Sequence, residues 1–307
     1  MRTTTEMKKK ILGHLVPLIS GLCAFMAVGL VIAILSTIVI GGAHTISWEF
    51  LTTAPREGMT QGGILPAILG TFWRVIIMTL VGVPIGTITA VYLVEYASQK
   101  SVLTRVVRFA VNTLAGIPAI VFGLFGLGFF VQFMGSGLDK IGSPAGTAVW
   151  GQPNILWASL TMAVLTLPVV IVSVEEAIRT VPRELREGSL ALGATKLSTI
   201  FRIVLPNSIT GILTGAILAV SRGAGEVAPI LFTGAAYYLP HLPHGLNEQF
   251  MDLGYHVYIM STQSTNVDAT KGLQFATTLV LLVMTFSLNA FAIGLRYHIR
   301  KKSIQLS

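Results

Sequence analysis

Long apolar stretches alternate with short polar ones along this chain. A helix that crosses the hydrocarbon core of a bilayer needs about 20 mostly apolar residues. Six segments meet that requirement: 16–40, 66–94, 106–133, 154–174, 208–236 and 273–295. The polar segments between them are too short for a soluble domain. The pattern therefore predicts an all-α polytopic membrane protein with six transmembrane helices, forming a single transmembrane domain over residues 1–307.

The composition agrees with this interpretation. Hydrophobic residues make up 53% of the chain and charged residues 11%, whereas a soluble domain is about 25% charged. The first apolar segment follows Lys8, Lys9 and Lys10, as the core of a signal peptide would. It runs for about 25 residues, however, and the core of a signal peptide has about 7–15. We therefore interpret residues 16–40 as a retained span.

Basic residues are distributed unevenly over the polar segments, and cytoplasmic loops are the ones enriched in Lys and Arg. With the N-terminus placed inside, the outer segments contain only Arg56, Lys140 and Lys271. The inner segments then contain sixteen basic residues: Arg2, Lys8, Lys9, Lys10, Lys100, Arg105, Arg108, Arg179, Arg183, Arg186, Lys196, Arg202, Arg296, Arg300, Lys301 and Lys302. Both termini and the loop 179–206 are predicted to be cytoplasmic. The net charge of +8 follows from this topology and requires no nucleic acid.

Small residues and helix-breaking residues occur within the predicted spans. The pairs Gly82/Gly86 and Gly211/Gly215 each place two glycines one helical turn apart, which allows helices to approach closely in lipid. Prolines inside a span can kink its helix, and four occur there: Pro84, Pro118, Pro168 and Pro229. These features predict close packing and irregular helices but identify no function.

The loop 179–206 is the most distinctive polar segment. Pro182 suits the first turn of a helix, and Leu185, Ser189 and Leu192 then recur on one face. Gly193 is a plausible stop, because glycine adopts left-handed backbone angles at low cost. On these grounds alone the segment is a short surface helix that could lie at the lipid headgroups.

The spacing within this loop resembles a known family pattern. Three consecutive residues, Glu187-Gly188-Ser189, are followed by Gly193 and, after nine further residues, by the ending Ile203-x-Leu205-Pro206. This layout is similar to the E-A-A, three residues, G, nine residues, I-x-L-P pattern of bacterial ABC importer permeases. Gly188 and Ser189 depart from the alanines that the family favours, although both are small. The resemblance implies a type I ABC importer permease fold and a loop that docks on a separate ATPase subunit.

Three charged residues fall inside predicted spans: Arg74, Arg222 and Glu226. A charge at the bilayer centre costs about 2.5–3.5 kcal/mol on insertion scales, so each needs a reason. Arg222 and Glu226 are four residues apart and would share one helix face, where they can pair. The pair is then either a structural ion pair or part of an oxyanion site, since arginine donates two parallel hydrogen bonds to such a ligand. Arg74 either faces the same cavity or reaches the outer headgroups.

A second resemblance covers residues from about 62 to 300. The run SRGAGEVAPILFTG at 221–234, the segment from Gly70-Thr71 through VPIG at 83–86 to YLVEY at 92–96, and YHVY at 255–258 with STQ at 261–263 resemble the PstA family of phosphate importer permeases. The resemblance favours a place for Arg222 and Glu226 in the path of inorganic phosphate, and Arg74 is a further candidate for that path. It also implies a bacterial cytoplasmic membrane and three kinds of partner: a homologous permease subunit, a dimer of ATP-binding cassette ATPases, and a periplasmic or lipid-anchored phosphate-binding protein.

Several motifs are absent from the sequence. It contains no Gly-Lys dipeptide, so it has no phosphate-binding loop for ATP, and neither H-E-x-x-H nor G-x-S-x-G occurs. His241 and His244 lie among prolines without an adjoining Asp, Glu or Cys, so no metal or cofactor is expected. We interpret the chain as a non-catalytic transport subunit. The alternatives are a permease for another oxyanion such as phosphonate or molybdate, an ATPase-independent channel, and a membrane-embedded enzyme; the docking loop argues against the last two.

Overall fold

The computed structural model describes residues 2–59, 61–98, 100–142, 147–264 and 267–304. Within them, six helical segments are long and apolar enough to cross a membrane: Leu15–Gly42, Leu65–Tyr96, Ala119–Gly142, Ile155–Arg179, Lys196–Gly225 and Thr270–Ile299. The predicted all-α, six-span architecture is thereby confirmed. The only strands in the described part are β1 (Pro55–Arg56) and β2 (Gln61–Gly62), which pair in an antiparallel hairpin.

Three long helices form the centre of the molecule: α3 (Leu65–Val91), α7 (Ile155–Arg179) and α10 (Leu205–Gly225). Helix α7 packs against both others. The predicted glycine pairs allow α3 and α10 to approach α7 closely. Gly82 and Gly86 lie against Ala163 and Val170 of α7, while Gly211 and Gly215 lie against Ala177 and Ser173 of the same helix. A Cβ atom at Gly86 or Gly211 would overlap its neighbour, so these glycines allow the contact.

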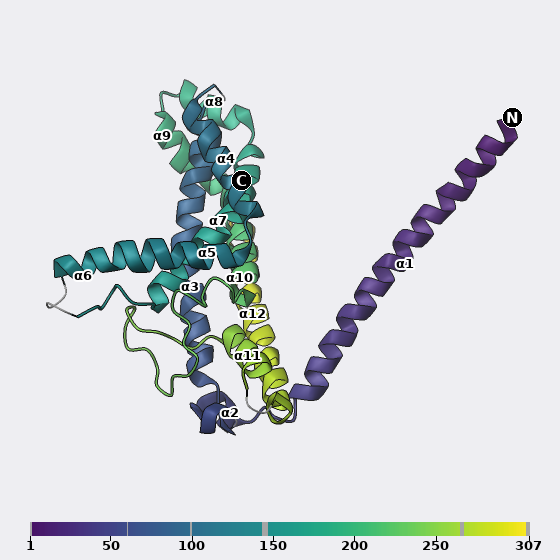
Figure 1. Ribbon diagram of the computed structural model, residues 1–307. Coiled ribbons are helices and arrows are strands. Elements are labelled where there is room, and N and C mark those ends of the chain that lie inside the picture. The colour runs from purple at the N-terminus through teal and green to yellow at the C-terminus, as the bar shows by residue number, and fades with distance from the viewer. Residues whose placement is uncertain (1, 60, 99, 143–146, 265–266, 305–307) are drawn as a thin grey trace.

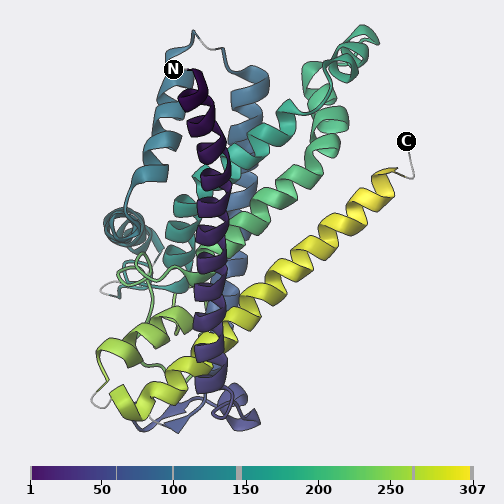
Figure 2. The same ribbon diagram turned by 90° about the vertical axis from the view of Figure 1, so that its right-hand side faces the viewer.

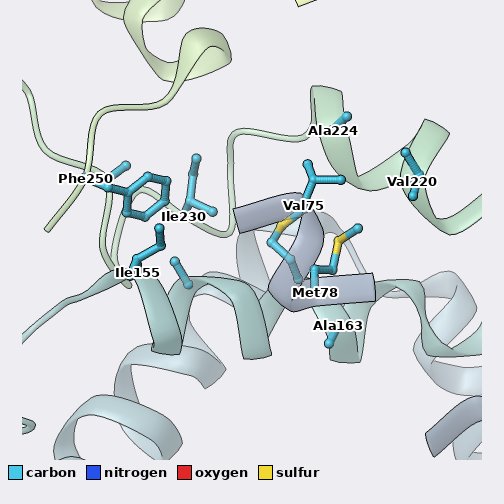
Figure 3. Close-up of a cluster of buried hydrophobic side chains, with 11 residues drawn as sticks. Val75, Met78, Ile155, Ala163, Val220, Ala224, Ile230 and Phe250 are labelled. Carbon is cyan, nitrogen blue, oxygen red and sulfur yellow. The ribbon is translucent and has the colours of Figure 1, made fainter. Parts of the chain in front are cut away.

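A buried apolar cluster joins these helices. Val75 and Met78 of α3 meet Ile155 and Ala163 of α7 and Ala224 of α10 (Figure 3). Ile230 and Phe250, from the irregular segment after α10, complete the cluster. Since the cluster includes both the end of α10 and the loop that follows it, this loop is part of the core and not a free connection.

The first helix stands apart from this bundle, whereas α12 (Val267–Ile304) packs along α10 and α11 (Leu253–Thr262). Helix α1 (Arg2–Gly42) projects away from the other elements (Figure 1) and contacts α12 where Gly41 and Gly42 meet Phe275 and Ala276. The most apolar part of α1 is not buried within this chain, so its side chains are available to lipid or to another subunit.

The two ends of the molecule differ in what they contain. The beginning of α1, the end of α12 and the loop helices α8 (Arg183–Ala191) and α9 (Lys196–Thr199) lie towards one end (Figure 2). Helices α2 (Trp48–Thr52) and α11 (Leu253–Thr262) lie at the other (Figure 1). The described ends of α1 and α12 therefore lie at the same end of the molecule as the loop, and the cytoplasmic placement of that end stays a prediction. Some of the basic side chains that set that orientation lie outside the described residues: those of Arg2, Lys8, Lys9, Lys10, Arg300 and Lys302.

The structure corrects two predicted spans. Segment 106–133 is not one helix: α4 (Val102–Gly116) ends before Ile117 and Pro118, and the chain restarts as α5 (Ala119–Gly126), which continues through a π-helical segment (Leu127–Gly135) into α6 (Ser136–Gly142). Pro118 has an extended ψ of 139°, and its missing N–H cannot continue the helix. Figure 1 shows α5 and α6 running across the bundle axis.

The second correction concerns the predicted span 208–236. Helix α10 ends at Gly225, and residues 226–236 form turns instead of helix. Two glycines just before this point lower the helix propensity, and Glu226 is extended, with φ −79° and ψ 127°. The chain therefore leaves the direction of α10 a few residues after Arg222.

Candidate coupling loop and substrate path

The loop 179–206 folds as three short elements. These are α8, α9 and a π-helical turn, η4 (Ile200–Val204), which leads directly into α10. Pro182 lies one residue before α8, and Pro206 lies in the first turn of α10, directly after the π-helical turn η4. Leu205 begins α10 and is half-buried, whereas Ile203 precedes it in η4. A π-turn at this point is notable because such segments often mark functional positions.

Gly193 ends α8 as predicted. Its φ is +83°, a left-handed angle that side-chain-bearing residues rarely adopt. The Gly193 N–H donates to the carbonyl of Leu190 at 3.0 Å, and the Ala194 N–H donates to the carbonyl of Ser189 at 3.2 Å. This is the paired capping of a Schellman motif. Ser189 also joins α8 to α9, because its hydroxyl lies 2.9 Å from that of Thr199.

Arg186 ties α8 to the body of the molecule. Its Nε donates to Oε1 of Glu95 at 3.1 Å, and its two terminal nitrogens donate to the carbonyls of Val181 and Ile178, each at 2.6 Å. Ile178 belongs to the last turn of α7 and Val181 follows that helix, so the cation also caps the negative end of the α7 dipole. The side chains of Arg186 and Glu95 are 17% and 12% exposed, which makes this the least solvated ion pair of the loop.

A second tie reaches the same place from α9. The Lys196 ammonium donates to the carbonyl of Glu95 and lies 4.7 Å from the centre of the Tyr96 ring, a cation–π arrangement. Glu95 and Tyr96 belong to η2 (Tyr92–Tyr96), the π-helical end of α3. Helix α8 is therefore tied both to the end of α3 and to the end of α7, and α9 is tied to the end of α3.

The outer face of the loop is open. A groove of about 400 Å³ runs between α8 and η4, and its lining includes Leu185, Gly188, Leu192 and Ile203. Leu192 is 92% exposed, and Glu187 and Gly188 are exposed beside it. A Cβ atom at Gly188 would meet no atom within 4 Å. The small size of Gly188 is therefore not required by packing among the described residues, whereas Ser189 contacts Thr199.

The structure does not pair Arg222 with Glu226. Because α10 ends at Gly225, Glu226 leaves the helix and the four-residue spacing no longer puts both on one helical face. No ion pair joins them in the part of the chain that the structure describes. Arg222 is exposed, and its neighbour Ser221 donates a hydrogen bond to Asn289 of α12 at 3.0 Å. Thus Arg222 stands at the end of α10 with its guanidinium accessible.

Arg74 lies in neither of the predicted places, because its side chain is 0% exposed and buried between three segments. Its Nε donates to Oδ2 of Asp252 at 2.9 Å, and its terminal nitrogens donate to the carbonyls of Gly223 and Ala224 at 2.8 and 3.1 Å. Thr71 donates to the same carboxylate oxygen at 3.0 Å. We call this set (Thr71, Arg74, Asp252 and the two carbonyls) the Arg74 latch.

The latch holds the end of α10 in place. The carbonyls of Gly223 and Ala224 belong to the last turn of α10 and carry its negative dipole end, which an arginine stabilises. Asp252 at the same time caps α11, accepting hydrogen bonds from the N–H groups of Gly254 and Tyr255 at 3.0 and 3.3 Å. Asp252 did not stand out in the sequence as a partner for Arg74. Its one local signal is an aspartate directly before an apolar helix, which is typical of an N-cap.

Residues 82–304 match the family described as the binding-protein-dependent transport system inner membrane component. The chain belongs to this family.

Several bacterial proteins resemble this inner membrane component over most of their length. YqgI of Bacillus subtilis (strain 168), named a probable ABC transporter permease protein, is 32% identical over 94% of this chain and 97% of its own. The phosphate transport system permease protein PstA of Mycobacterium leprae (strain TN) is 32% identical over 86% of this chain and 82% of its own.

Solved structures of ABC transporters share the fold. A chain of a bacterial alginate ABC transporter, crystallised with its pentasaccharide-bound periplasmic protein, superposes with a TM-score of 0.61 at 18% identity, covering 88% of this chain and 92% of that one. A chain of the inward-facing MetNI methionine ABC transporter gives 0.55 at 19% identity, covering 77% and 94%. The inner membrane component thus has the type I ABC importer permease fold, as the loop spacing implied.

Proposed function

We propose that this inner membrane component is the permease subunit of an ATP-driven importer of inorganic phosphate. The observation that carries the proposal is the similarity to a protein named a phosphate transport system permease over 86% of this chain. The family match at residues 82–304 begins within the second candidate span and covers the four spans that follow it. The chain would act as one transmembrane domain over residues 1–307, in the cytoplasmic membrane of a bacterium.

The loop 179–206 would dock on a separate ATPase subunit. Its open groove offers apolar surface on Leu185 and Leu192, and contiguous apolar surface of this kind marks contact sites. Through Arg186 and Lys196 the loop is tied to η2 and α7. Movement of an ATPase dimer would in this way rock the central helices and alternate access to the path, while ATP is hydrolysed on the partner and not on this chain.

The anion path would run along the exposed side of α10, between this chain and a homologous permease subunit. Arg222 is accessible there, and its planar fork suits a tetrahedral oxyanion. Glu226, one residue beyond the helix, would accept a hydrogen bond from a protonated phosphate oxygen. Arg74 would position α10 through the latch and would not touch the anion, because its donors are directed at Asp252 and two carbonyls.

The remaining partners follow from the two ends of the molecule. With both termini and the loop in the cytoplasm, α2 and α11 face outwards, where a periplasmic or lipid-anchored phosphate-binding protein would dock. Membrane lipid would cover the exposed apolar side chains of α1 and α12. The proposal requires no metal, cofactor or nucleic acid.

Two measurements on the reconstituted importer test the proposal. The ATPase subunit should co-purify with this chain, which an ATPase-independent channel would not require. Unlabelled phosphate should compete with labelled phosphate for uptake far more strongly than molybdate or methylphosphonate does. Stronger competition by molybdate or methylphosphonate would instead identify a permease for that oxyanion.

A further inference from the structure

A second group of arginines lies away from Arg222, at the end of the molecule that bears the loop. A cavity of about 740 Å³ opens between η2, α4, α7 and α8, and four guanidinium groups line it: those of Arg108, Arg179, Arg183 and Arg186. These arginines come from three helices that are distant in sequence, so the fold assembles the cluster. The proposed phosphate path does not use it.

The carboxylates around the cavity do not balance these arginines. Arg108 and Arg179 share one carboxylate oxygen of Glu175, at 3.4 and 3.2 Å, and Arg186 pairs with Glu95. Arg183 and Glu187, four residues apart on α8, form no ion pair within the described residues. Among the residues that the structure describes, Arg183 is therefore a cation at the cavity wall without an ion-pair partner.

The wall of the cavity also contains an unsatisfied hydroxyl. Thr104 of α4 is 3% exposed, and its Oγ1 has no hydrogen-bond partner among the residues that the structure describes. Buried polar groups nearly always have a partner, and an orphan calls for a water, an ion or a ligand. A threonine hydroxyl can donate to an anionic oxygen, as can the guanidinium groups around it.

We propose that this cavity binds a phosphate-bearing anion. Arginine forks match the geometry of phosphate oxygens, and Arg183 has donors free for such a ligand. The same chemistry is offered by the headgroup of an anionic lipid and by free inorganic phosphate. Because Arg186 also anchors α8, an anion here would brace the loop against α4 and α7 from the side opposite its open groove.

The test is a binding measurement on the purified full-length chain in an Arg222→Gln background, which removes the proposed transport contact. Arg183→Gln is the informative variant, since it strands no carboxylate, and Thr104→Val removes the hydroxyl at nearly constant volume. Arg105→Gln on α4 is the matched control, because Arg105 is exposed and does not line the cavity. Two arms separate the ligand sources: titration of delipidated protein with inorganic phosphate, and comparison of phosphatidylglycerol with phosphatidylcholine nanodiscs by thermal unfolding.

One arm should show binding that weakens about tenfold in Arg183→Gln, the loss of one charge-assisted contact, and less in Thr104→Val. A response to phosphate assigns the free anion, and a response to phosphatidylglycerol alone assigns the lipid. No response in either arm, or an equal loss in Arg105→Gln, overturns the proposal. Since no transport is measured, its failure would leave the proposed importer function untouched.

Discussion

The Arg74 latch should be one of the most sensitive points of the fold. Replacing Arg74 with Met removes three hydrogen bonds and leaves the Asp252 carboxylate buried without a cation. Removing one partner of a buried ion pair costs about 3–5 kcal/mol. Asp252→Asn should cost a similar amount by stranding the guanidinium, although asparagine still caps α11 as well as aspartate does. The substitution therefore separates the charge of Asp252 from its capping role.

The double variant provides the decisive comparison. Arg74→Met with Asp252→Asn leaves no unpaired charge, so its destabilisation should fall short of the sum of the two single effects by about 0.5–3 kcal/mol, the range of coupling for residues in contact. The assay is reversible unfolding of the detergent-solubilised protein. Arg56→Gln is the control, because Arg56 and Glu49 are 4.0 Å apart and mostly exposed, and such pairs contribute about 0–1 kcal/mol. Strictly additive effects, or losses no larger than in the control, would refute the latch.

Three further predictions concern the loop, pH and topology. Gly188→Trp should leave insertion unchanged, because the site is open, but should abolish ATPase co-purification and uptake; normal recovery of both would contradict docking at this groove. Burial lowers the pKa of His256, which lies outside the candidate spans, to about 4 from 6.5. Because the unfolded chain binds a proton at His256 more readily than the folded chain does, the free energy of unfolding is highest above pH 6.5 and falls as the pH drops towards 4. It should be lower at pH 5 than at pH 7.5 by about 2 kcal/mol. His256→Gln should remove most of this pH dependence, and an unchanged dependence in that variant would contradict the prediction. In a Cys23→Ser background, an impermeant thiol reagent added outside should label Gln263→Cys and spare Ser98→Cys. Labelling of Ser98→Cys alone would contradict the predicted topology.

Local patterns predicted much of this fold. The six spans were recognisable because a span is defined by a continuous run of apolar residues. The packing roles of Gly86 and Gly211 followed from small residues one turn apart, and the stop at Gly193 from the backbone freedom of glycine. Each of these signals lies within a few residues of the feature it predicts.

The remaining features depend on contacts between distant segments. Pro118 inside an apolar run indicated a kink, but only the packing of α5 on α7 decides that the chain turns across the bundle. The spacing of Arg222 and Glu226 would place them together only in a continuous helix, and α10 ends between them. Arg74 and Asp252 are separated by 178 residues, so no spacing rule could pair them.

The most direct test of the account is the initial rate of labelled phosphate uptake into vesicles that contain the assembled importer, with ATP on the side of the loop. We predict uptake that requires ATP and the ATPase subunit, and that falls at least about tenfold in Arg222→Gln, the loss of one charge-assisted hydrogen bond to the anion. Assembly should be unaffected, because Arg222 is exposed and forms no ion pair with Glu226 within the described residues. Arg222→Lys should retain only part of the rate, since lysine lacks the fork. Uptake that proceeds without ATP, or at the wild-type rate in an assembled Arg222→Gln importer, would contradict the account.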